Sequence, residues 1–325
     1  MRTEKIAVIT ACIAIVIGIG SSAGPIRDTI AGISEAEVQP VWAPQPSAAR
    51  EPLMQRIERA AAELRIAPID ARVDRVWKAI PGYNGLEVDV EATYRDTLAK
   101  GLQDPAEYIY KELPAKITLA DLGAQPTYRG NPAKPMVSLM INVAWGNEYL
   151  KPMLDTLDRE GVKTTFFLDG SWLKKNPELA EEIRKRGHEL GNHAYSHPRM
   201  SVLGADRASA EITKTQALLK AMGAESPWFA PPSGDYDQET VDIAYRHGLR
   251  TVLWTLDTVD WRNPAPEAVI SKIVSQAEPG FLVLMHPTSA SSRALEAMIR
   301  GIRKKGLLIG TVSETLSPQR VNAGS

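Results

Sequence analysis

The sequence predicts an α/β fold with a parallel β-sheet, formed by residues 134–316. Short apolar runs alternate there with stretches whose apolar residues recur at helical spacing. Some runs, such as 281–285, are apolar almost throughout, as strands buried on both faces require. The chain has 325 residues, of which 44% are hydrophobic, so it is long enough to bury a sizeable core.

Seven strands and six helices are expected in this region, and no repeat or low-complexity tract interrupts them. The strands are expected at 136–143, 164–168, 189–193, 228–230, 251–255, 281–285 and 307–312. The helices are expected at 147–160, 177–187, 205–222, 237–248, 265–277 and 291–305. This alternation is typical of repeated strand–helix units with parallel strands.

A linker and a small α+β module are expected upstream of the sheet. Residues 35–69 begin with a Pro- and Ala-rich stretch, which predicts an extended linker, and continue with a helix at 51–64. The module is expected at 70–133, and a tail at 317–325 follows the α/β region.

Three local patterns describe the module. Asn84-Gly85 is typical of a hairpin turn, residues 86–90 alternate as in a half-buried strand, and 105–113 has a helical pattern. No pattern identifies a partner protein for the segment 70–115.

The first 34 residues are typical of a signal peptide or a membrane anchor. Arg2 and Lys5 precede an apolar run over 6–20, and small residues follow at 21–23. The run has about 15 residues, whereas a membrane span needs roughly 20, so a cleaved signal and an anchor through 6–23 both remain open. In either case we expect an exported protein that acts outside the cytoplasm.

Composition disfavours two classes of function. The formal net charge is −1 and no basic stripe is present, so nucleic-acid binding is not expected. Cys12 is the only cysteine, which excludes a disulfide framework and a cysteine-based metal cluster.

Three of the five histidines stand at the carboxyl ends of predicted strands. In a parallel sheet these ends lie at the same edge. His193 and His197 follow the third strand, and His286 follows the sixth. Active sites of α/β barrels lie at this edge. Two neutral imidazoles suit zinc, cobalt or nickel, and a third imidazole can donate a proton to a leaving group. Hydrogen bonding to loop backbone is the alternative. His188 and His247 are expected to interact with helix dipoles.

Further candidates stand at the same edge, namely Asn142, Trp145, Asp169, Asp257, Asp260 and Trp261. The aspartates could supply charge and the tryptophans apolar walls, with a solvated loop as the alternative for residues 257–261.

Four segments in this order resemble the polysaccharide deacetylase family, the NodB-homology or family 4 carbohydrate esterases. They are 191–198 (GNHAYSHP), 229–234 (FAPPSG), 254–261 (WTLDTVDW) and 284–286 (LMH). The resemblance covers about residues 134–316. It implies a distorted (β/α)7 barrel and the metal-dependent removal of acetyl groups from N-acetylated sugars, such as those of peptidoglycan or chitin. The segment 140–149 and the upstream module resemble a sporulation-associated subgroup.

The family scheme implies a role for each histidine. His193 and His197 would hold a divalent metal, zinc or cobalt, together with an aspartate. A second aspartate would be the base, and His286 would protonate the leaving amine. Asp257 or Asp260 would pair with an arginine.

The chain departs from this scheme at three positions. The family's two adjacent aspartates after the first strand are matched by Asn142, at the base position, and Val143, and its arginine is Ala230. Losing a general base costs about 10²–10⁴-fold in rate. Losing a group behind a metal ligand costs about 10–100-fold in metal affinity, and losing a ligand costs at least as much. Weak or absent activity is expected.

Three hypotheses follow. The first is an exported deacetylase that uses a substitute carboxylate, with Asp169 as the leading candidate and Glu148 and Asp257 as others. The second is a protein without metal that binds cell-wall glycan through stacking on Trp145, Tyr195 and Trp261. The third is a structural role in the cell envelope, in which residues 70–115 bind a partner.

Overall fold

The structure is a computed structural model that describes residues 51–321. The expected signal or anchor and the linker before residue 51 lie outside the described residues, as do residues 322–325. The described residues from Leu53 onward form one compact unit. Among residues 51–321, no helix is long and apolar enough to cross a membrane.

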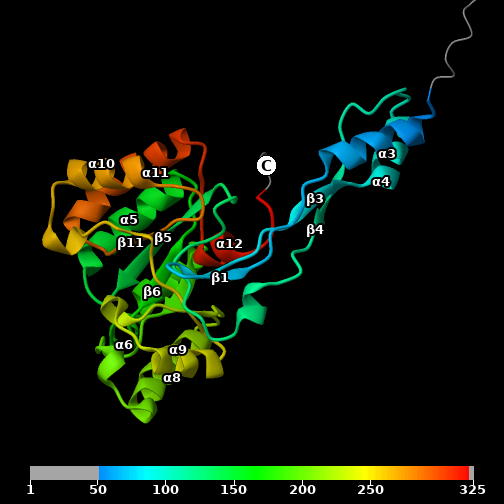
Figure 1. Ribbon diagram of the computed structural model, residues 1–325. Helices are drawn as coiled ribbons and strands as arrows, with labels where there is room; N and C mark the ends of the chain where they lie inside the picture. The colour runs from blue at the N-terminus through cyan, green and yellow to red at the C-terminus, as the bar shows by residue number, and fades with distance from the viewer. Residues whose placement is uncertain (1–50, 322–325) are drawn as a thin grey trace, which may run out of the picture. The chain divides into compact units, whose positions relative to one another are not determined.

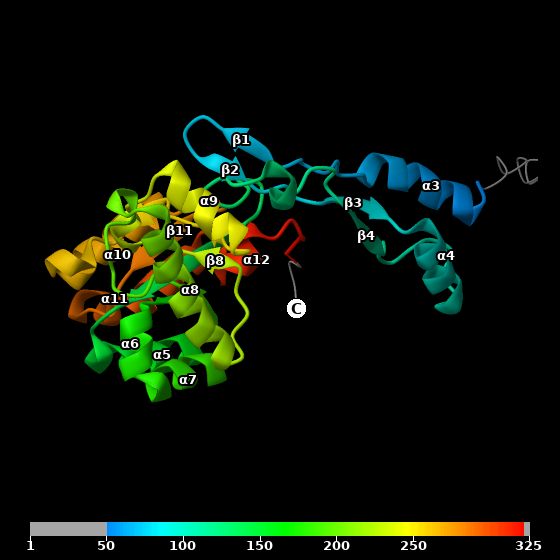
Figure 2. The ribbon, with the colours of Figure 1, turned by 90° about the horizontal axis from the view of Figure 1, so that it is seen from below.

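The α/β region is a curled parallel sheet with helices packed around it (Figures 1 and 2). The strand order is β10-β11-β5-β6-β7-β8-β9, with β12 also beside β5. The strands are β5 (Met136–Val143), β6 (Thr165–Leu168), β7 (Glu189–Asn192), β8 (Trp228–Phe229), β9 (Arg250–Thr251), β10 (Leu256–Asp257), β11 (Leu282–Met285) and β12 (Leu308–Gly310). All their pairings are parallel.

The strand expected at 251–255 is only partly present, because β9 ends at Thr251 and the next strand, β10, begins at Leu256. β9 pairs with β8, and β10 pairs with β11. One segment therefore bends from one edge of the sheet to the other and joins the two edges. Thr127 fills the interruption, because it bridges Val252 and its carbonyl accepts the N–H of Leu253 at 2.9 Å. This geometry is the expected distorted (β/α)7 barrel.

The six expected helices are present, with ends that differ by a few residues. They are α5 (Asn147–Arg159), α7 (Pro177–Lys185), α8 (Ala205–Ala221), α9 (Gln238–Arg246), α10 (Pro266–Gln276) and α11 (Ser289–Lys304). Two further helices, α6 (Gly170–Lys175) and α12 (Val312–Leu316), were not predicted. With six and five residues, they are too short to show a helical period.

The central strand β5 is buried on both faces. Alternate residues on one face, which include Leu139 and Val143, pack against apolar side chains of α5 and α11. On the other face Met140 packs against Phe167 and Leu282. Asn142 lies two residues after Met140, on the same face, so the strand presents it to the inside of the barrel.

The upstream module contains two antiparallel strand pairs and two helices (Figure 2). The pairs are β1 (Arg72–Asp74) with β2 (Lys78–Ile80), and β3 (Gly85–Val88) with β4 (Tyr110–Leu113). The helix α3 (Leu53–Leu64), expected at 51–64, packs against α4 (Val90–Ala99).

The local predictions for the module need correction. The hairpin turn lies at residues 75–77 and not at Asn84-Gly85. The Asn84 side chain instead bonds Glu112 and the N–H of Ala115. A Cβ on Gly85 would lie 2.2 Å from the Ile66 carbonyl oxygen, so glycine is needed there for a close backbone approach.

One further prediction for the module is wrong and another is confirmed only in part. The expected helix at 105–113 contains strand β4. The expected strand at 86–90 ends at Val88, and Val90 begins α4, which the Asp89 side chain caps at the N–H of Ala92 (2.9 Å). At 110–113, pairing with the distant strand β3 outweighed the local helical pattern.

Part of the expected tail is attached to the module. The N–H of Asn84 donates to the Pro318 carbonyl at 2.8 Å, and the Arg320 guanidinium lies 4.6 Å over the Tyr83 ring. Arg320 also donates to the Asn84 carbonyl at 3.0 Å. The described residues 317–321 thus hold the end of the barrel sequence against β3.

Candidate functional site

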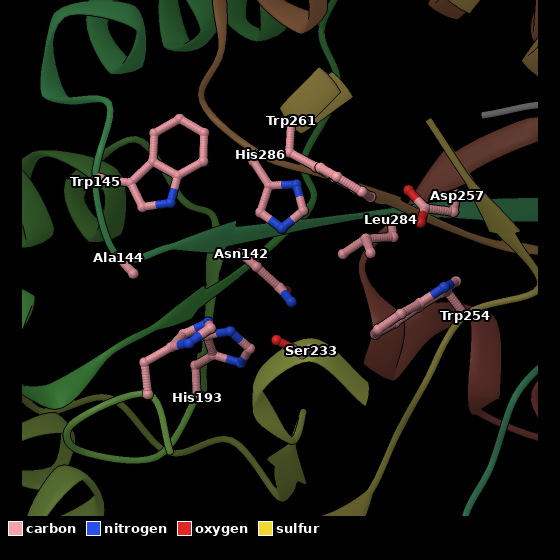
Figure 3. A pocket seen from close by; sticks show the side chains of 11 residues that line it. Asn142, Ala144, Trp145, His193, Ser233, Trp254, Asp257, Trp261, Leu284 and His286 are labelled. Atoms are coloured by element: carbon pink, nitrogen blue, oxygen red, sulfur yellow. The ribbon is translucent and has the colours of Figure 1, made fainter. Parts of the chain in front are cut away.

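A pocket of about 390 Å³ opens at the carboxyl ends of the barrel strands (Figure 3). Its lining residues are Asn142, Ala144, Trp145, His193, His197, Ser233, Trp254, Asp257, Trp261, Leu284 and His286. Asn142 lies between His286 and His193 in this view. The structure therefore brings together seven of the ten predicted site residues, and leaves Asp169, Tyr195 and Asp260 outside this lining.

A buried carboxylate holds His286. The Asp260 side chain is 0% exposed and its Oδ1 lies 2.8 Å from His286 Nδ1. Its Oδ2 accepts the backbone N–H of His286 at 2.6 Å and the hydroxyl of Ser291. Because a carboxylate only accepts, Nδ1 carries the hydrogen, and the ring is fixed with Nε2 free for a ligand.

The sequence did not predict this pair, because Asp260 and His286 are 26 residues apart. A signal was available in the parallel pairing of β10 with β11, which places the residues that follow the two strands side by side.

Two exposed tryptophans stand at the pocket mouth. Trp145 is 47% exposed and Trp261 53% exposed. The Trp145 ring is parallel to the His286 ring within 8°, with centroids 6.0 Å apart. Gly146 allows this approach, because a Cβ there would lie 2.0 Å from the Pro287 carbonyl oxygen and its φ is +83°.

The opposite side of the pocket carries the other two histidines. His193 Nδ1 lies 2.7 Å from the Ala230 carbonyl oxygen, so it is the donor and Nε2 the acceptor. Burial, aided by the nearby His197, lowers the pKa of His193 to about 3, which keeps the ring neutral. The His197 ring is exposed and lies 5.2 Å from the His193 ring, centroid to centroid.

Asp169 does not join these histidines, which corrects its expected role as a metal ligand. It caps α6, where Oδ1 accepts the N–H of Trp172 at 2.9 Å and the hydroxyl of Ser171 at 2.6 Å. Free N–H groups at a helix start attract a carboxylate that follows a strand. No group of three His, Cys, Asp or Glu within residues 51–321 could hold a metal ion. The donors present therefore do not fit the usual catalytic metal site with three protein ligands.

Val143 was matched to a metal-binding aspartate of the family, but its side chain does not face the pocket. Its side chain is 0% exposed and belongs to the core between the sheet and its outer helices. Because side chains alternate along a strand, Asn142 and Ala144 face the pocket and Val143 faces away. Ala144 and Trp145, and not Val143, accompany Asn142 in the pocket lining.

Tyr195 is not available for sugar stacking in the pocket. Its ring is half-buried and packs on the backbone of Gly170, where an added Cβ would lie 2.6 Å from Tyr195 Cδ2. The ammonium group of Lys214 lies 5.6 Å from the ring centroid. The expected stacking role of Tyr195 is therefore corrected.

Asp257 lines the pocket with no described arginine beside it. Its Oδ1 accepts the N–H of Val259 at 2.7 Å, which fixes the loop that follows β10. Ala230 is buried, and only its carbonyl contributes to the site.

His188, which was expected to interact with a helix dipole, lies beyond the C-cap of α7 at Arg186. Burial lowers its pKa to about 4, and Nδ1 accepts the N–H of Thr164 at 3.3 Å. It is a neutral core residue beside Phe166. His247 caps the end of α9 and bonds the Ser209 hydroxyl at 2.7 Å.

Backbone strain is concentrated in the loops around the pocket. Six described residues other than glycine have positive φ, and five of them are in these loops: Ala194, His197, Ser233, Val259 and Asn263. Left-handed backbone is costly for a β-branched residue such as Val259. Strain of this kind, about 1–3 kcal/mol per residue, persists where surrounding contacts hold it and clusters at functional sites.

Four pocket residues were not singled out from the sequence, namely Ala144, Ser233, Trp254 and Leu284. Three of them lie inside the family-like segments, which was the available signal. Ala144 has no polar group to draw attention to it.

Comparisons with known proteins agree with this geometry. The family model for polysaccharide deacetylase matches residues 129–252. The uncharacterized protein YlxY of Bacillus subtilis is 43% identical over 276 residues, which cover 85% of this chain and 86% of YlxY. A peptidoglycan-N-acetylglucosamine deacetylase of Bacillus cereus is 32% identical over 165 residues, which cover 49% of this chain and 60% of that protein.

A solved structure extends the similarity over barrel and module. The CE4 family pseudoenzyme from Bacillus anthracis is 41% identical with a TM-score of 0.78, and the match covers 84% of this chain and 98% of the pseudoenzyme. A mutant of the pseudoenzyme, with restored enzymatic activity, is 40% identical with a TM-score of 0.77 and matches 83% and 100% of the two chains.

Proposed function

Because this chain belongs to the polysaccharide deacetylase family, carbohydrate esterase family 4, we propose that it binds N-acetylated cell-wall glycan and has lost efficient deacetylation. The composition of the pocket carries the proposal. The pocket keeps exposed aromatic walls and the buried His286–Asp260 pair, but offers His193 and His197 no third metal-binding residue.

The polar groups in the pocket suit an intact acetamido group. The amide of Asn142 is 3% exposed, and its Oδ1 has no hydrogen-bond partner among the described residues. An unsatisfied buried polar group costs about 1–3 kcal/mol, which a ligand hydrogen bond would recover. Asn142 Oδ1 can accept the acetamido N–H, and Asn142 Nδ2 can donate to the acetyl carbonyl. His193 Nε2 can accept a further hydrogen bond from the sugar.

As formed by the described residues, the pocket lacks two groups that deacetylation normally uses, namely a third metal-binding residue and a general base. Deacetylation by water needs a base near the acetyl carbonyl, and neither Asn142 nor Ala144 is basic. Asp257, the carboxylate in the pocket lining, already accepts the N–H of Val259. His286 could still donate a proton, but a proton donor alone does not activate water. The absence of a general base accounts for about 10²–10⁴-fold in rate.

The relatives support both halves of the proposal. One deacetylase relative acts on peptidoglycan N-acetylglucosamine, and the 41% identical structure is that of a pseudoenzyme. Restored activity in a mutant of that pseudoenzyme agrees with a scaffold that survives the loss of chemistry. We also propose that the chain is exported through residues 1–34 and acts outside the cytoplasm. The proposal includes a small module at residues 70–133, a deacetylase-like domain at 134–316 and a role connected with sporulation.

The test measures binding and turnover together. Protein lacking residues 1–23 is titrated calorimetrically with N-acetylglucosamine oligomers and peptidoglycan fragments, and acetate release is followed with and without added zinc or cobalt. We expect binding without acetate release above background. Trp145→Ala should weaken binding by about tenfold, as loss of an aromatic contact predicts.

Tyr245→Ala is the matched control, because Tyr245 is 40% exposed on α9 and does not line the pocket. Acetate release that disappears in His193→Ala would contradict the proposal and show a working metal site. In that case Asp257→Asn should be tested first, because Asp257 is the carboxylate in the pocket lining.

A further inference from the structure

A second hollow of about 440 Å³ adjoins the pocket and shares Trp145 and Trp261 with it. We infer that this hollow is a subsite for a sugar that carries a carboxylate. The inference rests on the proposed function. A glycan whose acetamido group lies in the first pocket would extend across Trp145 and Trp261, so its next sugar would lie in the second hollow.

Arg293 supplies a cation to the second hollow. It lines the second hollow, and its Nε donates to the Ser289 carbonyl at 3.3 Å. Among residues 51–321 it forms no ion pair. Arg300, two turns further along α11, pairs instead with Glu160 at 2.9 Å and Glu296 at 2.7 Å. A guanidinium left unpaired beside a hollow can take an anionic ligand group.

A second arginine adds to the positive charge at this place. The Arg262 guanidinium lies 4.6 Å from the Trp261 ring centroid and has no ion-pair partner in the described part of the chain. The helix α11 also begins at Ser289, in the lining, so its positive end faces the hollow. Together these groups favour an anion beside the two tryptophans.

The nearby Asp260 carboxylate is not expected to repel an anionic ligand in this hollow. Asp260 lines the same hollow, but its two oxygens accept hydrogen bonds from His286 and Ser291. Its side chain is 0% exposed. The polar side chains of the lining that are left for a ligand include those of Arg293, Asn263, Thr288 and Tyr149.

The chemistry specifies an amino sugar with a carboxylate next to an N-acetylated sugar. N-acetylmuramic acid carries such a carboxylate on its lactyl group. The planar fork of a guanidinium matches a carboxylate with two parallel hydrogen bonds. The hollow should therefore distinguish this sugar from N-acetylglucosamine, which has the same ring without the charge.

The test compares two disaccharides of equal size by isothermal titration. Both join N-acetylglucosamine to N-acetylmuramic acid, and in one of them the lactyl carboxylate is converted to the amide. We expect the carboxylate form to bind about threefold to tenfold more tightly, because exposed ion pairs are modest. Arg293→Gln should abolish the preference, and 0.5 M salt (roughly a 4 Å screening length) should reduce it. Arg300→Gln is the matched control and should retain it.

The outcomes separate this inference from the proposed function. Equal affinity of the two disaccharides, with binding that still requires Trp145, overturns the subsite alone. Binding of glycerol phosphate oligomers that requires Arg293, without binding of the carboxylate disaccharide, also overturns it. Failure to bind any of the sugars overturns the proposed function as well.

Discussion

At the scale of single residues, two of the pocket histidines are held in place by hydrogen bonds. His286 is oriented by the buried Asp260, and His193 by the Ala230 carbonyl. The turn after β5 offers Asn142, Ala144 and Trp145 to the same pocket. Groups that can orient a ligand are thus present, whereas the described residues include no third metal-binding side chain beside His193 and His197.

A pair of substitutions tests which residue faces the pocket. Val143→Asp should destabilise the protein by at least about 3 kcal/mol, because it buries an unpaired carboxylate in an apolar core. Ala144→Asp should have little effect on stability. It should tighten zinc binding by about tenfold or more, since the aspartate adds a third ligand beside the two histidines.

Urea denaturation and zinc titration measure these two effects. Asn142→Asp serves as a further comparison at the neighbouring pocket position. If Val143→Asp were as stable as the parent, or if it bound zinc more tightly than Ala144→Asp does, the assigned direction of the strand side chains would be wrong.

The histidines show how far single residues could be predicted. Their clustering followed from parallel strands and was expected from the sequence. The partner of each histidine was not expected, because Asp260 and Ala230 become neighbours only when separate strands pair. Asp169 was misassigned for a similar reason, since the helix it caps was too short to detect.

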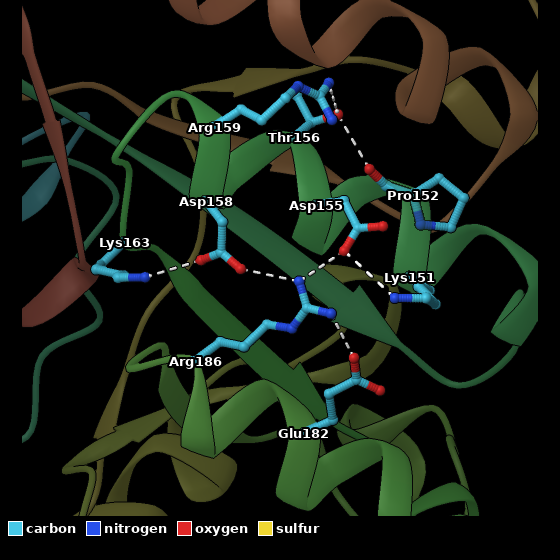
Figure 4. Close-up of polar contacts among 9 residues, drawn as sticks. All are labelled: Lys151, Pro152, Asp155, Thr156, Asp158, Arg159, Lys163, Glu182 and Arg186. Atoms are coloured by element: carbon cyan, nitrogen blue, oxygen red, sulfur yellow. Dashed lines mark hydrogen bonds and ion pairs between the residues drawn. The ribbon is translucent and has the colours of Figure 1, made fainter.

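At the scale of elements, α5 and α7 are joined by a network of charges around Arg186 (Figure 4). Arg186 bonds Asp155 and Asp158 of α5, each at 2.8 Å, and Glu182 of α7 at 2.5 Å. Its side chain is 19% exposed, whereas those of its three carboxylate partners are 35–43% exposed, so solvent screens the network in part. The network fixes two helices that cover neighbouring strands.

Removing the cation should weaken this connection. Arg186→Gln should lower the free energy of unfolding by about 1–2 kcal/mol, because three carboxylates lose a shared partner. Arg159→Gln is the control, since Arg159 is 59% exposed and forms a single ion pair at 3.3 Å with Glu296. It should change stability by about 0.5 kcal/mol or less.

The effect should depend on pH in a defined direction. Hydrogen bonding to Arg186 holds the pKa of Asp155 below its ordinary value of 3.8, and the pKa of Asp158 is also lowered, although its burial opposes this. Depressed carboxyl pKa values stabilise the fold above about pH 4 and lose that effect as the pH falls further. The difference between parent and Arg186→Gln should therefore shrink below pH 4 in urea denaturation. A difference that grows in acid would refute this account.

At the scale of the whole molecule, a buried lysine joins the start of the barrel to its last helix. Lys134 is 2% exposed, and its Nζ donates to the Ser317 carbonyl at 2.9 Å and to the Glu314 carbonyl. Burial lowers its pKa to about 8. These carbonyls belong to the end of α12, so the lysine closes the barrel end opposite the pocket loops.

This lysine predicts an unusual response to alkali. Its pKa is about 8 in the folded chain and 10.5 ordinarily, so the unfolded chain binds more protons between these values. The stability of the parent relative to Lys134→Met should therefore rise from about pH 8 to 10.5. Thermal unfolding of both proteins across this range measures the difference, and a constant difference would count against the buried position of Lys134.

The sequence by itself determined the class of fold, the order of most strands and helices, and the clustering of His193, His197 and His286. These properties depend on the period of apolar residues and on the rule that parallel strands share one carboxyl edge. Only the tertiary structure decided that Asp260 pairs with His286, that Val143 faces the core, and that Asp169 caps a helix. Each of these depends on contacts between distant segments or on one residue of strand register, which local patterns do not encode.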